Sequence, residues 1–279
     1  MRIARGVQAL LTRSGLTQTE VAKRAGVSPG TVNRYMSWQD TKGLRVPTVR
    51  AIADGCGATE SERDALADLV TSQEDGWWMD HPAVPAILDP LLSFESFASY
   101  EQVWANVLVP GLLQSPGYAL ALHQDGNPDA SAEDVADTVA ARMQRQEVLD
   151  RSPALHLSVI LDEAVLRRRV GDAQVMAEQI DHLVSMAERP NVNIQILPES
   201  SGAHAAGSGG HFVLLGREDR DPLASMAVVY LELHRKGIYL DAPDDVDDYR
   251  TMFDGLSANA ADSATSMDLL ASARQEYLQ

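Results

Sequence analysis

The sequence of 279 residues contains a single cysteine, Cys56, which excludes a disulfide within the chain and makes a reducing cytoplasm the expected compartment. It has no run of 18 apolar residues, and its first residues form a basic amphipathic pattern, so we expect neither a membrane span nor a signal peptide. Internal repeats and low-complexity blocks are also missing. The length leaves room for a second domain with its own core.

Acidic residues are nearly absent from the first 50 positions. Residues 1–50 hold nine lysines or arginines and only two acids, Glu20 and Asp40, whereas residues 51–279 hold 14 basic and 38 acidic residues. A segment of charge +7 is therefore attached to a remainder of charge −24. This asymmetry indicates a polyanion-binding head on an acidic body, and the alternative is a solvated basic surface without a partner.

The stretch LTQTEVAKRAGVSPGTVNRYM, residues 16–36, contains the start signals of two short helices. Thr17 and Glu20 form a capping-box signature, and Gly26 supplies the left-handed residue that ends the first of these helices. Ser28 caps the next helix, with Pro29 at its first position. An apolar stripe over residues 3–11 predicts one more helix upstream.

A small residue, a glycine and an aliphatic residue follow one another at positions 22, 26 and 32, which is the spacing of a helix-turn-helix. The segment from Gln18 to Tyr35, continued by VPTVRAIADGCGATESERDAL, resembles the DNA-binding domain of the Xre and lambda-repressor type. The resemblance covers about the first 70 residues. It implies that Gln18 anchors a phosphate and that residues early in the third helix read bases.

The predicted DNA-binding residues begin the second helix, line the third helix and follow it: Thr17, Gln18, Ser28, Gly30, Thr31, Asn33, Arg34, Lys42 and Arg45. Pro29 and Gly30 offer no side-chain donor, so direct readout is assigned to Asn33 and Arg34 with the neighbouring hydroxyls. Arginine reads guanine and asparagine reads adenine in bidentate fashion, although Arg34 has a phosphate contact as its alternative. Lys42 and Arg45 are expected to contact the DNA backbone or an adjacent groove.

We expect three parts: a helix-turn-helix domain over residues 1–71, a linker over 72–90 and a second domain over 91–279. Alternation in LHLSVIL and VNIQILP predicts half-buried strands, and HFVLLG and MAVVYLELHRKGIYLD add more, the last as a hairpin. Helices are expected over residues 91–102, around 135–148, over 173–190, and from Val246 and Ser263. The predicted fold is an all-α, lambda-repressor-like domain followed by an α+β domain with a small mixed sheet covered by helices.

Four segments of the second domain carry a further resemblance: VPGLLQSPGYA, VILDEAVLRRRVG, HLVSMAERPNVNIQILPESSGAHAAGSGGHFVLL and YLELHRKGIYLD. They resemble the carboxy-terminal domain of the WhiJ-like, antitoxin-like Xre regulators of Actinobacteria, from about residue 104 onward. The resemblance implies a transcriptional regulator that commonly works with a small acidic partner protein. It implies no agreed biochemical role for the domain itself.

No catalytic constellation can be assembled, so we expect no enzyme, no cofactor and no metal. The loop SSGAHAAGSGGHF lacks the Lys-Ser/Thr of a phosphate loop, and His204 and His211 are seven residues apart, which fits no standard metal pattern. Glu163, Arg168, His204 and His211 are candidates for binding a small-molecule effector. For Glu163 and the neighbouring arginines, local ion pairs and helix capping are the alternative.

Two functions remain open. One is a sequence-specific, DNA-binding transcriptional regulator, a homodimer on double-stranded DNA whose second domain dimerises and senses a small molecule or a partner protein. The other is an antitoxin-like interaction protein that binds a small partner protein and binds DNA only for autoregulation.

Overall fold

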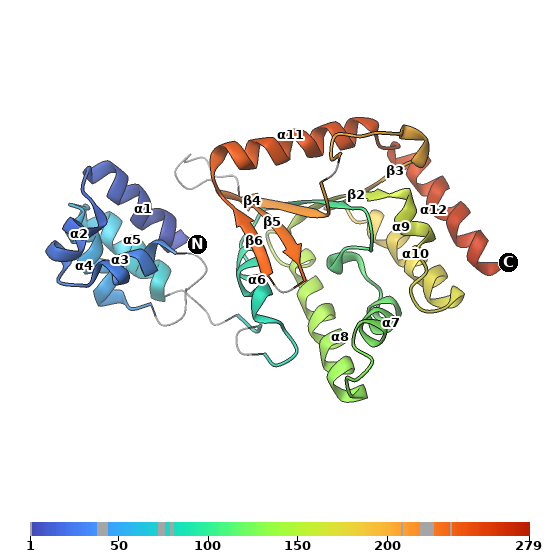
Figure 1. Ribbon diagram of the computed structural model, residues 1–279, viewed down its shortest axis with the longest axis horizontal. Coiled ribbons are helices and arrows are strands. Elements are labelled where there is room, and N and C mark those ends of the chain that lie inside the picture. The colour runs from blue at the N-terminus through green and yellow to red at the C-terminus, as the bar shows by residue number, and fades with distance from the viewer. Residues whose placement is uncertain are drawn as a thin grey trace. The chain divides into compact units, whose positions relative to one another are not determined.

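The computed structural model describes residues 2–37, 44–71, 76–78, 81–207, 209–217, 226–234 and 236–279 (Figure 1). The chain divides into two compact units, residues 1–79 and 80–279, and the boundary falls inside the segment predicted as a linker. Within the described ranges, every helix is too short or too polar to span a bilayer.

The first unit is all-helical. Its helices are α1 (Arg2–Ser14), α2 (Gln18–Ala25), α3 (Pro29–Met36), α4 (Val46–Gly55) and α5 (Glu60–Thr71). Side chains from each helix form one core, in which Val7, Val21, Val32 and Ile52 are fully buried. The apolar positions that the sequence predicted to face inward therefore form a core that belongs to this unit alone.

The predicted ends of α2 and α3 are confirmed. The Thr17 hydroxyl accepts the N–H of Glu20 at 3.3 Å, and the Glu20 carboxylate accepts the N–H of Thr17 at 2.8 Å, which completes the capping box. Gly26 ends α2 in the left-handed region, at a φ of 67°. Ser28 begins α3 by accepting the N–H of Thr31 at 3.0 Å. The turn between the two helices is thus set by local chemistry.

The second unit is built on a mixed sheet of six strands among the described residues. These are β1 (Tyr100–Ala105), β2 (His156–Asp162), β3 (Val192–Leu197), β4 (Phe212–Arg217), β5 (Met226–Leu233) and β6 (Lys236–Leu240). The order across the sheet is β3-β2-β1-β4-β5-β6. The first three strands pair in parallel, and β1, β4, β5 and β6 pair antiparallel. The predicted α+β domain with a small mixed sheet is confirmed.

Helices cover both faces of this sheet (Figure 1). They are α6 (Asp89–Glu95), α7 (Pro116–Gly126), α8 (Ala132–Gln146), α9 (Glu163–Arg167), α10 (Ala173–Ala187), α11 (Pro243–Asn259) and α12 (Ser263–Leu278), with 3-10 turns η1 (Ala86–Leu88), η2 (Gly111–Leu113), η3 (Glu147–Leu149) and η4 (Glu199–Ser201). Phe253 and Leu256 of α11 pack against Trp104 and Phe212 on one face. Because side chains alternate along a strand, Glu101 and Val103 of β1 face the other side, toward α8.

The helix expected over residues 91–102 is wrong in its second half. Helix α6 ends at Glu95, and the chain then enters β1, which pairs with β2 on one side and β4 on the other. Glu101 and Gln102 conceal this strand in the sequence, because a central strand is normally apolar. Its backbone hydrogen bonds to two neighbours outweigh the local preference.

In the first unit, Arg13 at the end of α1 is paired with Glu62 in the first turn of α5. The Nη2 atom of Arg13 donates to Glu62 at 2.8 Å, and the same carboxylate accepts the N–H of Thr59 at 2.8 Å in a second capping box. The hydrogen bond from Arg13, with that from Thr59 second, lowers the pKa of Glu62 from its ordinary value of 4.5 to about 2.

This lowered pKa predicts an acid-dependent stability. Because Glu62 holds its proton less tightly when folded, its stabilising effect is complete above pH 4.5 and is lost as the pH falls toward about 2. Glu62→Gln should therefore reduce the stability of the first unit at pH 7. Near pH 2 the difference in stability between the variant and wild type should become smaller. Melting curves across this range measure the effect. Glu60→Gln, on the same helix, is the control, and equal curves for Glu62→Gln and wild type at pH 7 would contradict the prediction.

Candidate functional sites: the recognition helix and a charged cavity

Helix α3 presents the predicted residues on its outer side. Asn33 is exposed, together with Ser28 and Gly30 at the start of the helix, while Thr31 and Arg34 are half-buried. On the opposite side, Val32 and Tyr35 are buried in the core of the unit. Those two side chains fix the rotation of α3 about its axis, and this rotation keeps the polar side available for contact.

Two of the predicted base-reading hydroxyls are already engaged with each other. The oxygen of Ser28 lies 2.9 Å from the hydroxyl oxygen of Thr31, and it also accepts the Thr31 N–H. Breaking the helix cap to reach a base costs about 1 kcal/mol. The two hydroxyls are therefore engaged within the helix cap.

The buried Tyr35 connects α3 to the start of α4. Its hydroxyl accepts the N–H of Arg45 at 2.6 Å and donates to the Arg45 carbonyl oxygen at 3.2 Å. Arg45 is exposed beyond this backbone link, and Lys42 lies outside the described residues. At the other end of the motif, Thr17 is exposed and Gln18, the first residue of α2, is half-buried.

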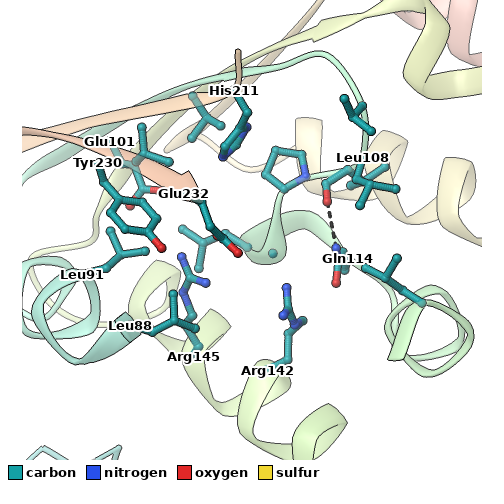
Figure 2. A pocket seen from close by; sticks show the side chains of 18 of the residues that line it. Leu88, Leu91, Glu101, Leu108, Gln114, Arg142, Arg145, His211, Tyr230 and Glu232 are labelled. Atoms are coloured by element: carbon teal, nitrogen blue, oxygen red, sulfur yellow. Dashed lines mark hydrogen bonds between the residues drawn. The ribbon is translucent and has the colours of Figure 1, made fainter. Parts of the chain in front are cut away.

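The second unit contains a cavity of about 460 Å³ on the sheet face opposite α11 (Figure 2). Strands β1, β4 and β5, helix α8 and the η2 segment line it. Figure 2 shows Arg142 and Arg145 rising from α8 toward Glu101, Tyr230 and Glu232 of the sheet. Aliphatic side chains complete the wall, so that charged and apolar side chains share the surface of the cavity.

Arg145 is held by a buried partner. Its Nε atom donates to the Glu95 carboxylate of α6 at 2.9 Å and its Nη2 atom at 2.5 Å, and the exposed fractions of the two side chains are 13% and 3%. Burial by itself lowers the pKa of Arg145, but attraction to Glu95 and these hydrogen bonds outweigh it, so the pKa is raised. The pair is a fixed, bidentate cross-link between α6 and α8.

Arg142 lies one turn earlier on α8 and has no such partner. It makes no hydrogen bond or ion pair to any described residue, and burial, with repulsion by Arg145 second, lowers its pKa to about 10. It therefore stays protonated near neutral pH. Gly111 leaves room for it, since an added Cβ there would lie 2.7 Å from Nη1 of Arg142 and 3.2 Å from Nη1 of Arg145.

The acid Glu101 lies at the same cavity and is buried. Burial, with repulsion by Glu95 second, raises its pKa well above 4.5, and its Oε2 atom has no hydrogen-bond partner among the described residues. Gln114 donates to the Val109 carbonyl at 2.8 Å, while its own Oε1 atom has no such partner. His211 also lines the cavity, and burial lowers its pKa, so the neutral imidazole is favoured.

The structure does not bring the four sequence-predicted ligand residues together. His211 lines the cavity, but His204 packs edge-on against Trp104 at 5.1 Å, and Trp104 belongs to the core under α11. Glu163 accepts hydrogen bonds from Arg167 at 2.6 Å and from the N–H of Glu199 at 2.9 Å, and Arg168 is exposed. Among the described residues, no group of three or more metal-ligating side chains occurs.

The sequence reasoning missed Arg142, Arg145 and Glu101, which line the cavity, and Glu95, which holds Arg145. One signal was present for part of them: period-two alternation in β5 places Tyr230 and Glu232 on one face. The buried acids gave no signal, because charged residues are normally expected on the surface.

These features define a protein in which a helix-turn-helix DNA-binding domain is joined to an α+β domain. A family model described as a helix-turn-helix domain matches residues 2–66. DNA is the partner that the first domain implies. The chain belongs to the family described as a domain of unknown function, DUF5753, whose model matches residues 88–272. Neither a curated protein nor a solved structure matches the chain.

The buried ion pair generates a prediction on stability. Arg145→Met leaves the Glu95 carboxylate buried without its partner, and removing one partner of such a pair costs about 3–5 kcal/mol. The free energy of unfolding, measured with urea on the full chain, should fall by that amount. Arg142→Met, one turn away on the same helix, is the matched control and should cost far less. Equal losses for the two variants would show that the Glu95 contact carries no special weight.

Proposed function

We propose that this protein is a sequence-specific transcriptional regulator of the Xre type, with α3 entering the DNA major groove. The observation that carries the proposal is α3 itself: buried Val32 and Tyr35 hold it so that Asn33 is exposed and Arg34 half-exposed on the polar side. The basic balance of residues 1–50 supplies the attraction to phosphates. Lys42 and Arg45 contact the DNA backbone in this proposal.

The second domain, by the same proposal, is a dimerising and sensing module of the WhiJ-like kind and has no enzymatic activity. Two heads joined in a homodimer reach half-sites about one helical turn apart on DNA. The charged cavity supports sensing of a small molecule, because a few polar groups and several aliphatic side chains share its wall. The single buried cysteine is consistent with the cytoplasm as the compartment.

The antitoxin-like alternative is favoured by exposed apolar side chains on the second unit. Val107 and Leu233, at the cavity, are 46% and 49% exposed, and Ile238 of β6 is 39% exposed. Such residues are suited to a protein partner. A small protein that co-purifies stoichiometrically with the full chain would favour this alternative, whereas a homodimer without it favours the regulator.

The readout residues generate a prediction on DNA binding. Asn33→Ala and Arg34→Ala should each weaken a specific operator complex by about 1–3 kcal/mol, because each removes a bidentate base contact, while binding to random DNA barely changes. Titrations on operator and scrambled duplexes measure both quantities at one salt concentration. An equal loss on the two duplexes would show that the residue contacts a phosphate instead.

Arg45→Ala is the control for these titrations. Arg45 is exposed, and it holds the start of α4 through its backbone, which the substitution keeps. Loss of a phosphate contact should weaken binding to both duplexes alike and make the salt dependence shallower by about one charge. An unchanged slope would remove Arg45 from the interface.

A fragment of residues 1–71 tests the pairing role of the second domain. It keeps the basic end and loses most of the acids, but a Debye length of about 8 Å already limits repulsion from a separate domain. Loss of pairing should dominate, since linked heads gain roughly 10²–10⁴ in affinity. We expect sedimentation to show that the fragment is a monomer. At low salt it should bind random DNA at least as well as the full chain does, and it should lose most of its preference for the operator. Full operator affinity at physiological salt would refute pairing by residues 91–279.

A further inference from the structure

The two arginines of α8 that line the cavity differ in what they contact. Arg145 is saturated by Glu95, whereas Arg142 has no hydrogen bond or ion pair to a described residue. Arg142 is half-buried, and a guanidinium that gives up part of its hydration without gaining a hydrogen bond loses free energy. The fold nevertheless positions it carefully, with Gly111 leaving space beside its Nη1 atom. This cost is explained if the partner of Arg142 is a ligand.

Three further polar groups of the cavity have spare hydrogen-bonding capacity. The Oε2 atom of Glu101, the Oε1 atom of Gln114 and the hydroxyl of Tyr230 are buried without a partner among the described residues. Burial raises the pKa of Glu101 and so favours its protonated form, which can donate one hydrogen bond, while Gln114 can accept one. Buried polar groups are nearly always satisfied in native proteins, so three exceptions lining one cavity point to the same missing partner.

The aliphatic part of the cavity surface indicates what the uncharged portion of the ligand is like. Leu88, Leu91, Val103, Leu112 and Val213 form apolar wall, and the volume of about 460 Å³ lies in the range of small-molecule sites. Arg145 is already bonded to Glu95, so Arg142 is the guanidinium that is left for an anion. One guanidinium pairs with one carboxylate, whereas the second charge of a dianion such as a phosphate ester would face the carboxylate of Glu232, which also lines the cavity.

We propose that the cavity binds a small monocarboxylic acid with an apolar, hydrogen-bond-donating body, its carboxylate paired with Arg142 and its donor directed to Gln114. A planar carboxylate fits the guanidinium fork in bidentate fashion. Glu101 supplies a second hydrogen bond. The inference rests on the proposed sensing role for its biological meaning, but binding of the acid is measured without DNA.

The test uses the full-length protein at pH 7 and two probes, indole-3-acetate and 3-(4-hydroxyphenyl)propionate. Calorimetric titration should show at least one acid binding with one site per chain and a dissociation constant of about 1 mM or lower. The matched primary amides, which lack the charge, should bind about tenfold or more weakly, and phenyl phosphate should not compete with the acid. Binding should also raise the melting temperature.

Arg142→Met should weaken the acid about 10–100-fold, since a charge-assisted bidentate contact is lost. The melting temperature of the unliganded variant should fall far less than that of Arg145→Met, because Arg142 makes no hydrogen bond or ion pair to a described residue. Arg142→Lys, which keeps the charge and loses the fork, should show a smaller loss and remains informative if the methionine variant fails to fold. Arg169→Met, which removes an exposed arginine of the same domain, is the matched control.

Three results would overturn the proposal: neither acid binds, an acid binds Arg142→Met as well as wild type, or phenyl phosphate binds more tightly than both acids. Failure of the regulator proposal would look different. In that case the acids bind as described, while operator and scrambled duplexes are bound equally.

Discussion

The second unit depends on one buried contact, the ion pair between Glu95 and Arg145. Glu95 ends the helix that leads into the central strand, and Arg145 lies on the helix that faces the same side of the sheet. The pair joins these two elements and sets the direction of the residues one turn away on α8. The Glu95 carboxylate is fully engaged by Arg145, so by our proposal the partner of Arg142 is the ligand in the cavity. Of the two arginines on α8, one therefore holds the fold together and the other binds.

In the first unit the governing interactions are short-range. The capping boxes at Thr17 and Thr59, the left-handed Gly26 and the cap at Ser28 all act within three or four residues. For this reason the helices of the DNA-binding unit could be predicted from sequence. The hydrogen bond between the hydroxyls of Ser28 and Thr31 could not be predicted, because only the folded geometry shows that the two groups contact each other.

The second unit was predictable in outline and not in its centre. Strands β2 and β3 alternate between apolar and polar residues and were recognised, as was the hairpin of β5 and β6. The sequence predicts helix over β1, because Glu101 and Gln102 interrupt the apolar pattern expected of a central strand. The cavity could not be predicted either, because its lining residues come from segments far apart in the sequence and meet only through tertiary contacts. Of the four candidate ligand residues, only His211 lines the cavity.

The two faces of the sheet serve different purposes. On β1, Trp104 packs under α11, while its neighbour Val103 and the more distant Glu101 face the cavity. Substitutions at odd and even positions of one strand therefore have different consequences: one set tests the solvent-free packing that keeps the domain folded, and the other alters what the cavity recognises. A chain built in this way can change its chemical preference by point substitution while its scaffold stays intact.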